Sequence, residues 1–529
     1  MDLDVIVIGA GHNGLTCAYY LAARGLKVAV LEASETVGGA AVTDDFLPGF
    51  RNYAASYTVS LLNPKVIRDL ELERHGLKVV LRKRDNFLPG DGEYLLAGRN
   101  GLTRKEIVRL NKADGKGYDR YIDELEKVVP LLKKWILRAP PEVGAGAKGL
   151  PSLLTLGRDM VGLLTHEIRT VHDFATRSAG EILDRYFEGD LAKALFGFDG
   201  VVGNFASPYA PGSAYVLLHH LFGEAAGVPG AWGHAIGGMG SITQAMARAA
   251  REKGVDIVLG TPVEEIIVDK GRAAGVVAGG KAWRAKTVIS GVNPKLLFDK
   301  LVPQGSVDAD VHSRMNHWKG ESATFRMNVA LSELPKFTVL PKKGDHLTAG
   351  IIMAPSLDYM HKAWLDAEIN GWTKQPIVEM LIPSTLDSTL APKGKHVASL
   401  FCQHFRYKLP NGRNWDSERE KAADAIIALV DSHAPGFAKS VLGRQIHSPL
   451  DLERRFGLIG GDIFHGKMSL DQLFSARPMI GYADYRMPLP GLYLCGSGSH
   501  PGGGVTGAPG HNAAQAVLAD RKPWSRRRP

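Results

Sequence analysis

The chain has few cysteines and no long apolar run. Its 529 residues contain 3 cysteines, Cys17, Cys402 and Cys495, and none belongs to a CxxC pair. Dithiol redox chemistry and a cysteine metal site are therefore disfavoured, and the cysteines are expected to be small buried side chains in a reducing compartment. A membrane-spanning helix needs a predominantly apolar segment. The notable stretches without charged residues, 487–519 and 200–223, are interrupted by prolines, glycines and histidines, so no spanning helix is expected.

The charge pattern excludes one class of partner. A net charge of +9 is dispersed over small basic clusters, one of them in the tail 521–529, and no nucleic-acid-binding motif accompanies them. We expect a solvated basic surface and no nucleic-acid partner, with attraction to anionic lipid as the alternative. Because the chain starts almost directly on its first expected strand, no targeting peptide is expected and a cytoplasmic protein is predicted, with peripheral membrane contact left open. No metal site is predicted, and nothing in the sequence indicates an oligomeric state.

A glycine motif stands at the start of the chain. The apolar strand 5–8 runs into Gly9, Gly11 and Gly14, which have the spacing GxGxxG, and a helix is expected over 15–24. In such a unit the first glycine allows a tight turn, the second lets a pyrophosphate approach the backbone, and the third lets helix and strand pack closely. The helix N-terminus adds free N–H groups and a partial positive charge. The motif therefore predicts a dinucleotide site.

The residues after this turn indicate which dinucleotide is bound. Glu32 ends a second apolar strand, 28–31, about twenty residues on, where such units place the acid for a ribose hydroxyl. The doublet Gly38-Gly39 follows, as in FAD proteins of the glutathione-reductase type, where the chain passes beneath the flavin. Many relatives have an arginine just after the doublet, whereas this chain has Ala40, so an arginine contact to the cofactor is not expected there. No second complete GxGxxG unit appears, and a separate NAD(P)H domain is not expected.

The other end of the chain carries a corresponding motif. A short strand, 492–496, is followed by three glycines, 502–504, and then by a helix. Glycines leave room for a large planar ring against the backbone. The helix N-terminus would stabilise the negative charge that develops on a reduced flavin. An FAD stretched between the two glycine motifs would explain both of them.

Length and pattern favour an α/β protein of two or three domains. The FAD-binding domain, Rossmann-like and of the glutathione-reductase type, would be discontinuous and comprise residues 1–80, 231–300 and 481–520. Residues 81–230 are expected to form a mostly helical substrate or cap region. Residues 301–480 alternate strand-like and helical runs and are expected to form an antiparallel sheet over the flavin, which gives a mixed α+β substrate domain.

Three local patterns lead to more specific expectations. A helix over 118–137 contains Pro130, which should kink or split it. The leucine-rich start of 150–187 is apolar on more than one face, so a buried helix is expected, with a surface that dips into lipid or admits substrate as the alternative. Ser241 is expected to cap the helix that follows the glycine-rich stretch 237–240.

Further stretches carry a family pattern. Together with the first motif they are 5–14, 38–41, 207–215, 237–240, 461–466, 471–474 and 491–512. On these residues the chain resembles, over its full length, the phytoene-desaturase-type flavoproteins of the amine-oxidase superfamily, and among them the pyridine nucleotide-disulphide oxidoreductase domain-containing protein 2 type. The resemblance implies one non-covalent FAD. Its implied contacts are Gly9, Gly11, Gly14, Glu32, Gly38, Gly39 and Ala40 on the adenosine and pyrophosphate side, the backbone of Val263 at the adenine, and Gly496, Gly503, Gly504 and Val505 at the flavin end.

The leading hypothesis is an FAD-dependent oxidoreductase of the desaturase or dehydrogenase type. A C–H bond of a small apolar substrate, isoprenoid- or polyene-like, would give a hydride to flavin N5, and the cofactor would do the demanding chemistry. One stretch departs from the carotenoid pattern. Carotenoid desaturases carry an Asp-Ala-Gly-like stretch after the doublet, and the matching residues here are Tyr-Ala-Ala-Ser, 53–56, so carotenoid specificity is not carried over. Disulfide chemistry is not expected, because the sequence offers no cysteine pair.

No pair of residues demands assignment as catalytic acid and base. Arg326, in a largely apolar run, and His500, beside the glycine loop, are candidates to face the flavin, and an ordinary structural role is the simpler interpretation of each. An amine oxidase on the same fold is one alternative, for which Trp232, Tyr53 and Tyr57 could supply an aromatic cage. A flavoprotein whose role is to bind a regulatory partner is the other.

Overall fold

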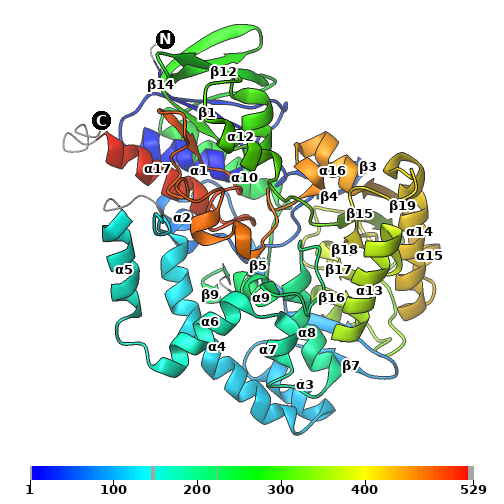
Figure 1. Cartoon of the computed structure of the whole chain (residues 1–529). Helices are drawn as coiled ribbons and strands as arrows, with labels where there is room; N and C mark the ends of the chain where they lie inside the picture. Colours follow the sequence, from blue (N-terminus) through cyan, green and yellow to red (C-terminus); the bar gives the residue numbers. More distant parts are fainter. Residues whose placement is uncertain (1–2, 144–148, 222, 522–529) are drawn as a thin grey trace.

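Two seven-stranded sheets organise the computed structural model, which describes residues 3–143, 149–221 and 223–521 (Figure 1). One sheet lies at the top of this view with both ends of the described chain, and the other lies below it beside a group of helices. The basic tail predicted at 521–529 lies outside the described residues, except for Arg521.

The first sheet is assembled from distant parts of the chain. Five strands run parallel in the order β11-β2-β1-β14-β20, and β12, β13 and the first part of β14 form an antiparallel meander beside them. Their bounds are β1 (Leu3–Ile8), β2 (Val28–Leu31), β11 (Asp256–Val258), β12 (Val263–Asp269), β13 (Arg272–Ala278), β14 (Lys281–Ser290) and β20 (Leu492–Leu494). Ser290 of β14 pairs with Ile8 on one side and with Leu494 on the other. The first and last strands therefore flank the same strand, which confirms the predicted Rossmann-like α/β class.

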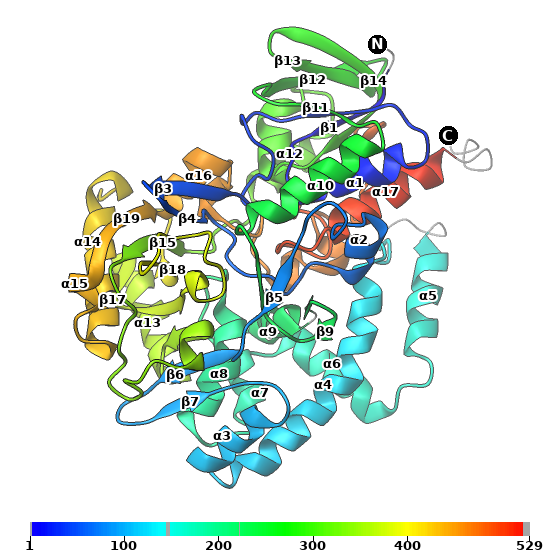
Figure 2. The same ribbon diagram turned by 180° about the vertical axis from the view of Figure 1, so that it is seen from behind.

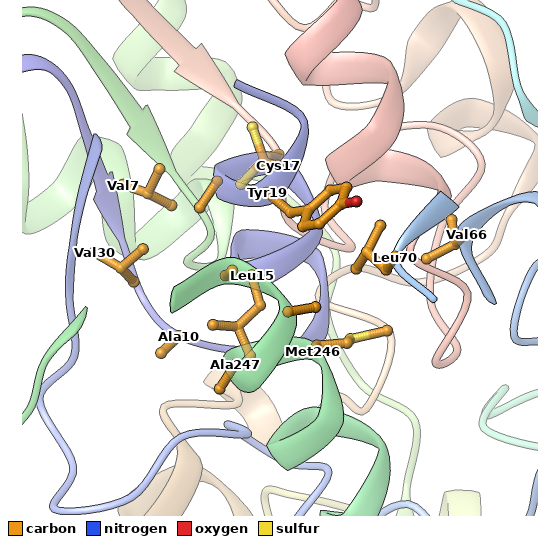
Figure 3. Packing of buried hydrophobic residues seen from close by; sticks show 14 of the residues in the cluster. Val7, Ala10, Leu15, Cys17, Tyr19, Val30, Val66, Leu70, Met246 and Ala247 are labelled. Carbon is orange, nitrogen blue, oxygen red and sulfur yellow. The ribbon is translucent and has the colours of Figure 1, made fainter. Parts of the chain in front are cut away.

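Three helices cover one face of this sheet: α1 (His12–Ala22), α10 (Gly240–Glu252) and α17 (Ala508–Asp520). Figure 3 shows Val7 and Val30 of the strands turned toward Leu15 of α1, with Ala247 of α10 close by. All four residues of β2 are buried, as expected for a parallel strand covered on both faces. A Cβ on Gly510 would lie 2.1 Å from the carbonyl oxygen of Asn13, so only glycine allows α17 to lie this close to α1.

The start of α10 differs from the sequence expectation. The helix begins at Gly240, and Met239, not Ser241, is the N-cap residue. The Ser241 hydroxyl donates to the carbonyl of Gly238 at 2.8 Å and so caps no free N–H group. The expectation was wrong because the helix starts one residue earlier than the glycine pattern suggested.

The second sheet has the order β19-β15-β18-β17-β16-β6-β7. The strands are β6 (Asn86–Pro89), β7 (Tyr94–Leu96), β15 (Thr324–Leu331), β16 (Gly350–Met353), β17 (Trp372–Leu381), β18 (His396–Phe405) and β19 (Val441–His447). All neighbours are antiparallel except β6 and β16, which run parallel. The sheet is thus mixed, because two short strands from the mostly helical region 81–230 extend the sheet expected from 301–480.

Smaller elements connect these units. They are the hairpin β3 (Thr43–Leu47) and β4 (Phe50–Tyr53), the pair β5 (Val79–Leu81) and β10 (Gly233–Ala235), the pair β8 (Glu224–Ala225) and β9 (Val228–Pro229), and the helices α2 (Pro64–Asp69), α11 (Pro294–Leu296), α12 (Ala309–Asn316), α13 (Leu357–Asn370), α14 (Trp415–His433), α15 (Phe437–Ser440) and α16 (Pro449–Phe456). The helix α14 covers the second sheet, into whose core its Ile426 and Val430 are buried.

The helical region contains α3 (Leu102–Leu110), α4 (Asp114–Ile136), α5 (Leu150–Met160), α6 (Thr165–Thr176), α7 (Ala179–Leu183), α8 (Asp190–Val201) and α9 (Ser213–Leu221). The expected break at Pro130 does not divide α4, which continues through the proline to Ile136. Tyr121, Leu125 and Val128 form its buried face. None of the described helices combines the length and hydrophobicity that crossing a bilayer requires.

The expectation of a buried helix at the start of 150–187 is wrong. No residue of α5 is buried, and the helix lies at the edge of the molecule in both views (Figures 1 and 2). Of thirteen exposed large apolar side chains among the described residues, seven fall between 143 and 168. They are Val143, Leu150, Leu153, Leu154, Val161, Leu164 and Ile168. Sequence pattern identified an apolar helix here, but not the absence of a neighbouring element to cover it.

Candidate functional site

A cavity of about 940 Å³ starts at the carboxyl ends of β1, β2 and β14 and reaches Phe401 of β18 in the second sheet. Ten of the twelve predicted cofactor residues line it. They are Gly9, Gly11, Gly14, Glu32, Gly38, Gly39, Ala40, Val263, Gly504 and Val505. Residues from both ends of the chain and from its middle therefore form the wall of one site.

The first glycine turn has the geometry that a pyrophosphate requires. A Cβ on Gly14 would lie 2.1 Å from the carbonyl oxygen of Gly9, so α1 can pack against the turn only with glycine at this position. A Cβ on Gly11 would meet no atom within 4 Å, and Gly11 lines the cavity. The backbone here is open to a ligand at the N-terminus of α1, and the residues present fit FAD.

Glu32 lies at the end of β2, where it lines the cavity. One carboxylate oxygen accepts the N–H of Ala10 at 2.6 Å, and the other accepts the N–H of Ser34 at 2.9 Å. These bonds fix the acid against the glycine turn. Each carboxylate oxygen has a further lone pair, so Glu32 can still accept a ribose hydroxyl.

Two predicted glycines, Gly496 and Gly503, lie behind the cavity wall. A Cβ on Gly496 would be 2.5 Å from the carbonyl oxygen of Gly291, and one on Gly503 would be 2.0 Å from the ring of Phe464. Both glycines permit close packing of the segments that carry the lining residues Gly291 and Phe464. In this structure their contacts are with the protein.

The other end of the cavity is aromatic. The rings of Tyr57 and Phe401 stack with centroids 4.7 Å apart, and both line the cavity together with Trp232. Tyr53 is buried elsewhere: its hydroxyl is 3.1 Å from Nδ1 of His234, outside the cavity lining. Of the three aromatic residues considered for a cage, Trp232 and Tyr57 therefore share the site.

Arg326 lies behind the aromatic pair. Its guanidinium is 4.9 Å from the ring centre of Tyr57 and 5.4 Å from that of Phe401, and it donates to Ser399 Oγ at 2.7 Å. Arg326 is absent from the cavity lining, so it faces the rings and not the cavity. Its position favours a cation–π role that fixes Tyr57 and Phe401.

Tyr57 connects the cavity with buried carboxyl groups. Burial raises the pKa of Tyr57 well above its usual value, and its hydroxyl is in hydrogen-bonding contact with Glu379. Burial also raises the pKa of Glu379 and that of Asp199, which lies close to Glu379. The Arg82 guanidinium, 4.0 Å from Glu379, opposes both of these shifts. Tyr57 therefore stays protonated at neutral pH.

His500 is also outside the cavity lining. Its Nε2 is 3.2 Å from the carbonyl oxygen of Trp135, and its ring meets that of Phe474 edge-on at 5.4 Å. Burial lowers the pKa of His500 to about 4. The structure thus places His500 between the glycine loop and α4, where it joins two parts of the protein.

Sequence reasoning missed several residues that line the cavity. His12 and Asn13 occupy the variable positions of the GxGxxG motif, and His465 and Ser497 come from the C-terminal segments. The Asn13 side chain donates to Ser497 Oγ at 3.2 Å, which joins the two glycine motifs directly. The GxGxxG spacing could have indicated His12, because the variable positions open the helix, but nothing local indicated His465.

One buried arginine holds the C-terminal segments together. The Arg477 guanidinium donates to the carbonyl oxygens of Ser497, Phe464, Gly466 and Gln472 at 2.8–3.2 Å. Its side chain has no solvent exposure. Because Phe464 and Ser497 line the cavity, Arg477 fixes part of the cavity wall from behind.

The cysteines are all buried and free, as the sequence predicted. Burial raises the pKa of Cys17 well above its usual value, with the neighbouring Cys495 thiol adding to the shift. Burial likewise raises the pKa of Cys402. These thiols are therefore poor nucleophiles. Within the described residues, no group of three or more His, Cys, Asp or Glu side chains could hold a metal ion.

A glycine turn at a Rossmann-type strand, an acid at the end of the next strand and a cavity that continues to a second sheet define an FAD-dependent oxidoreductase. Comparison with known families agrees. Residues 7–70 match the NAD(P)-binding Rossmann-like domain, and residues 103–322 match the flavin containing amine oxidoreductase family.

Similarity to individual proteins extends over the whole chain. "Pyridine nucleotide-disulfide oxidoreductase domain-containing protein 2" of Rattus norvegicus is 40% identical over 98% of this chain and 94% of its own. The chain belongs to the family of that protein. A limonene dehydrogenase polypeptide of Castellaniella defragrans is 25% identical, with 98% and 94% covered. Phytoene desaturase (neurosporene-forming) of Cereibacter sphaeroides is 24% identical, with 99% and 96% covered.

The fold is also that of a solved amine oxidase. The structure of putrescine oxidase bound to putrescine superposes with a TM-score of 0.60 and 18% identity, covering 98% of this chain and 99% of that one. At this identity the likeness concerns the fold alone. It confirms that the two-sheet arrangement is that of FAD-dependent oxidases.

Proposed function

We propose that the protein oxidises a C–H bond of an apolar, isoprenoid- or polyene-like molecule. The carrying observation is the state of the carboxylates that line the cavity, which are Glu32, Asp44 and Glu264. Glu32 is held by two backbone N–H groups, Asp44 receives both outer nitrogens of Arg455, and Glu264 accepts the N–H of Gly280. Along the described cavity wall, every carboxylate thus has a protein partner, which disfavours an ammonium substrate.

The wall beyond the cofactor turn supports the same proposal. It is formed mainly by apolar and aromatic side chains, among them Val59, Leu61, Leu62, Val202, Trp232, Phe401, Ile463 and Phe464. Such a wall binds a ligand through burial of apolar surface and excludes water. The similar proteins named for limonene and phytoene add support, since the substrates in those names are hydrocarbons.

The side chains at this end suit chemistry that needs no ionised base. Burial lowers the pKa of His220, which lines the cavity, to about 4, so its imidazole is neutral and weakly basic at neutral pH. Tyr57 keeps its proton on account of burial and Glu379. FAD, when bound, supplies the hydride acceptor. The protein's part is to orient the apolar substrate, hold Tyr57 and Phe401 rigid through Arg326, and exclude water.

Anaerobic reduction of the flavin tests this proposal. The holoenzyme is mixed without oxygen with a polyene such as phytoene in detergent, with limonene, or with putrescine or benzylamine, and the visible flavin absorbance is followed. We expect loss of this absorbance with the hydrocarbons and not with the amines. Reduction by the amines alone would contradict the proposal and favour an amine oxidase, for which Trp232 and Tyr57 supply two aromatic walls. No reduction by any of them would contradict it too and favour a partner-binding flavoprotein.

We further propose that α5 and the start of α6 contact an anionic membrane surface. The face carries the seven exposed apolar side chains between 143 and 168. Its carboxylate Asp159 is neutralised by Lys134 at 2.5 Å and Arg138 at 2.7 Å, while Arg158 and Arg169 remain exposed. An apolar face flanked by positive charge is complementary to the headgroup boundary of an anionic bilayer. An apolar substrate would be collected from such a surface.

Vesicle flotation tests the membrane contact. The double variant Leu154→Ser/Val161→Ser is expected to bind phosphatidylglycerol-containing vesicles at least about tenfold more weakly, because each buried side chain contributes roughly 1.5–3 kcal/mol. The control, Leu365→Ser/Ile369→Ser, changes two apolar residues of α13 that are 44% and 64% exposed and should bind as the wild type does. Equal binding of both variants would contradict the proposal. So would a dimer in solution that the Leu154/Val161 variant alone dissolves, since this would assign the face to a second copy.

A further inference from the structure

Two histidines meet where the N-terminal glycine turn approaches the C-terminal segments. His12 is the first residue of α1, and His465 belongs to the segment that Arg477 fixes. Both line the cavity, and each lies within electrostatic range of the other. His12 also makes a hydrogen bond to the backbone of Gly504, in the second glycine motif. The pair thus occupies the seam that an FAD stretched between the two motifs would cross.

Each imidazole leaves one buried nitrogen unsatisfied by the protein. Nε2 of His12 and Nδ1 of His465 are both inaccessible to solvent and lack a hydrogen-bond partner. A buried polar atom left without a partner costs about 1–3 kcal/mol. Such atoms need an explanation, and in a ligand cavity the simplest explanation is that the ligand supplies the partner.

The surroundings of the pair are electropositive. Burial lowers the pKa of His12 to about 4, opposed by the bond to Gly504. Burial also lowers the pKa of His465 to about 4, with His12 and Arg477 adding to the shift. The charged or titratable groups that act on the pair are thus these three side chains, and none of them is acidic. Without a ligand both rings are neutral at neutral pH, in a site suited to an anion.

We propose that His12 and His465 bind the diphosphate of FAD as hydrogen-bond donors. They would take the place of the arginine that relatives carry after the glycine doublet, where this chain has Ala40. The diphosphate carries negative charge, and the N-terminus of α1, where His12 stands, favours it there. The inference goes beyond the proposed function, because it concerns the cofactor whatever the substrate.

FAD binding at this pair is linked to protons. A neutral imidazole has one N–H donor and one bare acceptor nitrogen. His12 uses one nitrogen toward the Gly504 backbone, in a bond that favours the protonated ring, and its other nitrogen is the unsatisfied one. A phosphate oxygen accepts hydrogen bonds only, so the contact forms when the ring gains a proton. FAD binding therefore raises the imidazole pKa above about 4 and takes up protons in the pH interval between the free and bound pKa values.

FAD affinity is therefore expected to depend on pH. A group whose pKa rises on binding favours the complex at low pH, so FAD affinity should fall as the pH rises through the bound-state pKa. For one linked proton the dissociation constant changes by up to about tenfold per pH unit. Calorimetric titration of deflavinated protein with FAD, in two buffers of different ionisation enthalpy, measures the number of protons taken up. ADP, which carries the diphosphate, should show the same uptake, and riboflavin, which carries no phosphate, should not.

Substitution of His465 provides the second test. His465→Ala is expected to weaken FAD binding by about 10- to 100-fold, as for the loss of a charge-assisted hydrogen bond of about 1.5–3 kcal/mol. His465→Lys, whose ammonium is charged over this pH range, should recover much of the affinity and lose much of the pH dependence. The control is His433→Ala, which removes a half-buried histidine at the end of α14, far from the cavity lining.

Thermal stability separates this role from a structural one. Because the His465 nitrogen is unsatisfied without ligand, His465→Ala should leave the melting temperature of the apoprotein unchanged while reducing the shift that FAD produces. Wild-type FAD affinity in His465→Ala would overturn the proposal. Binding of FAD without proton uptake would overturn it too, even where the affinity falls.

Discussion

A Gly11→Val variant is expected to fold and to lose FAD. Gly11 has φ −68° and ψ 169°, which any residue adopts, so valine causes no backbone strain. No atom lies within 4 Å of an added Cβ, and the position lines the cavity at the start of α1. The valine side chain would therefore fill the space where the pyrophosphate approaches the backbone.

The expected effect of Gly11→Val is a loss of FAD affinity of at least about 100-fold, or roughly 3 kcal/mol. Flavin content after purification and titration of the apoprotein with FAD measure it. Gly157→Val is the matched control, since a Cβ there also meets nothing within 4 Å but the residue is on the exposed helix α5. Normal flavin content in Gly11→Val would remove the glycine turn from the cofactor site. An unfolded Gly11→Val apoprotein would contradict the geometry given for it.

Removal of the Arg477 guanidinium is expected to have the largest effect on stability. Arg477→Met would leave the carbonyl oxygens of Ser497, Phe464, Gly466 and Gln472 without this donor in the interior. Buried acceptors that lose their partner cost about 1–3 kcal/mol each, and neighbouring losses are not additive, so we expect a destabilisation of about 3–5 kcal/mol. Burial lowers the pKa of Arg477 to about 10, so the group is still charged at neutral pH.

Denaturant unfolding of the apoprotein measures this effect. The control is Arg454→Met, whose guanidinium is 55% exposed and pairs with Asp416 at 2.6 Å, and which should change stability by less than about 1 kcal/mol. Arg477→Lys is expected to fall between, because an ammonium cannot reproduce the planar fork of donors. If Arg477→Met unfolds at the same denaturant concentration as Arg454→Met, the carbonyls have other partners and Arg477 does not fix the cavity wall.

The cofactor end of the protein could be predicted because its signals are local. The spacing of Gly9, Gly11 and Gly14, the buried strand before them and the acid Glu32 all fall within one βαβ unit, whose geometry constrains each residue separately. The C-terminal motif was recognisable for the same reason. Gly496 and Gly503 show the limit of this reasoning, since their contacts with Gly291 and Phe464 join segments far apart in the chain.

The rest depended on tertiary contacts that the sequence pattern does not encode. Arg326 stood out as a charge in an apolar strand, but its position behind Tyr57 and Phe401 requires the pairing of β15 with β18. The apolar helix α5 was recognised, yet whether a neighbour covers it depends on how the other helices are placed. His465 lies in the cavity only because Arg477 fixes its segment against the glycine motifs. Such placements are properties of the assembled fold.

The central claim is that the two ends of the chain hold one extended FAD between them. The most direct measurement is the flavin released from the purified protein by denaturation, identified by chromatography and quantified against the protein concentration. We predict FAD, in a ratio of about one per chain after reconstitution, consistent with a single glycine turn of this type in the chain. A colourless protein that takes up no FAD from solution would contradict the claim, and so would the release of FMN in place of FAD.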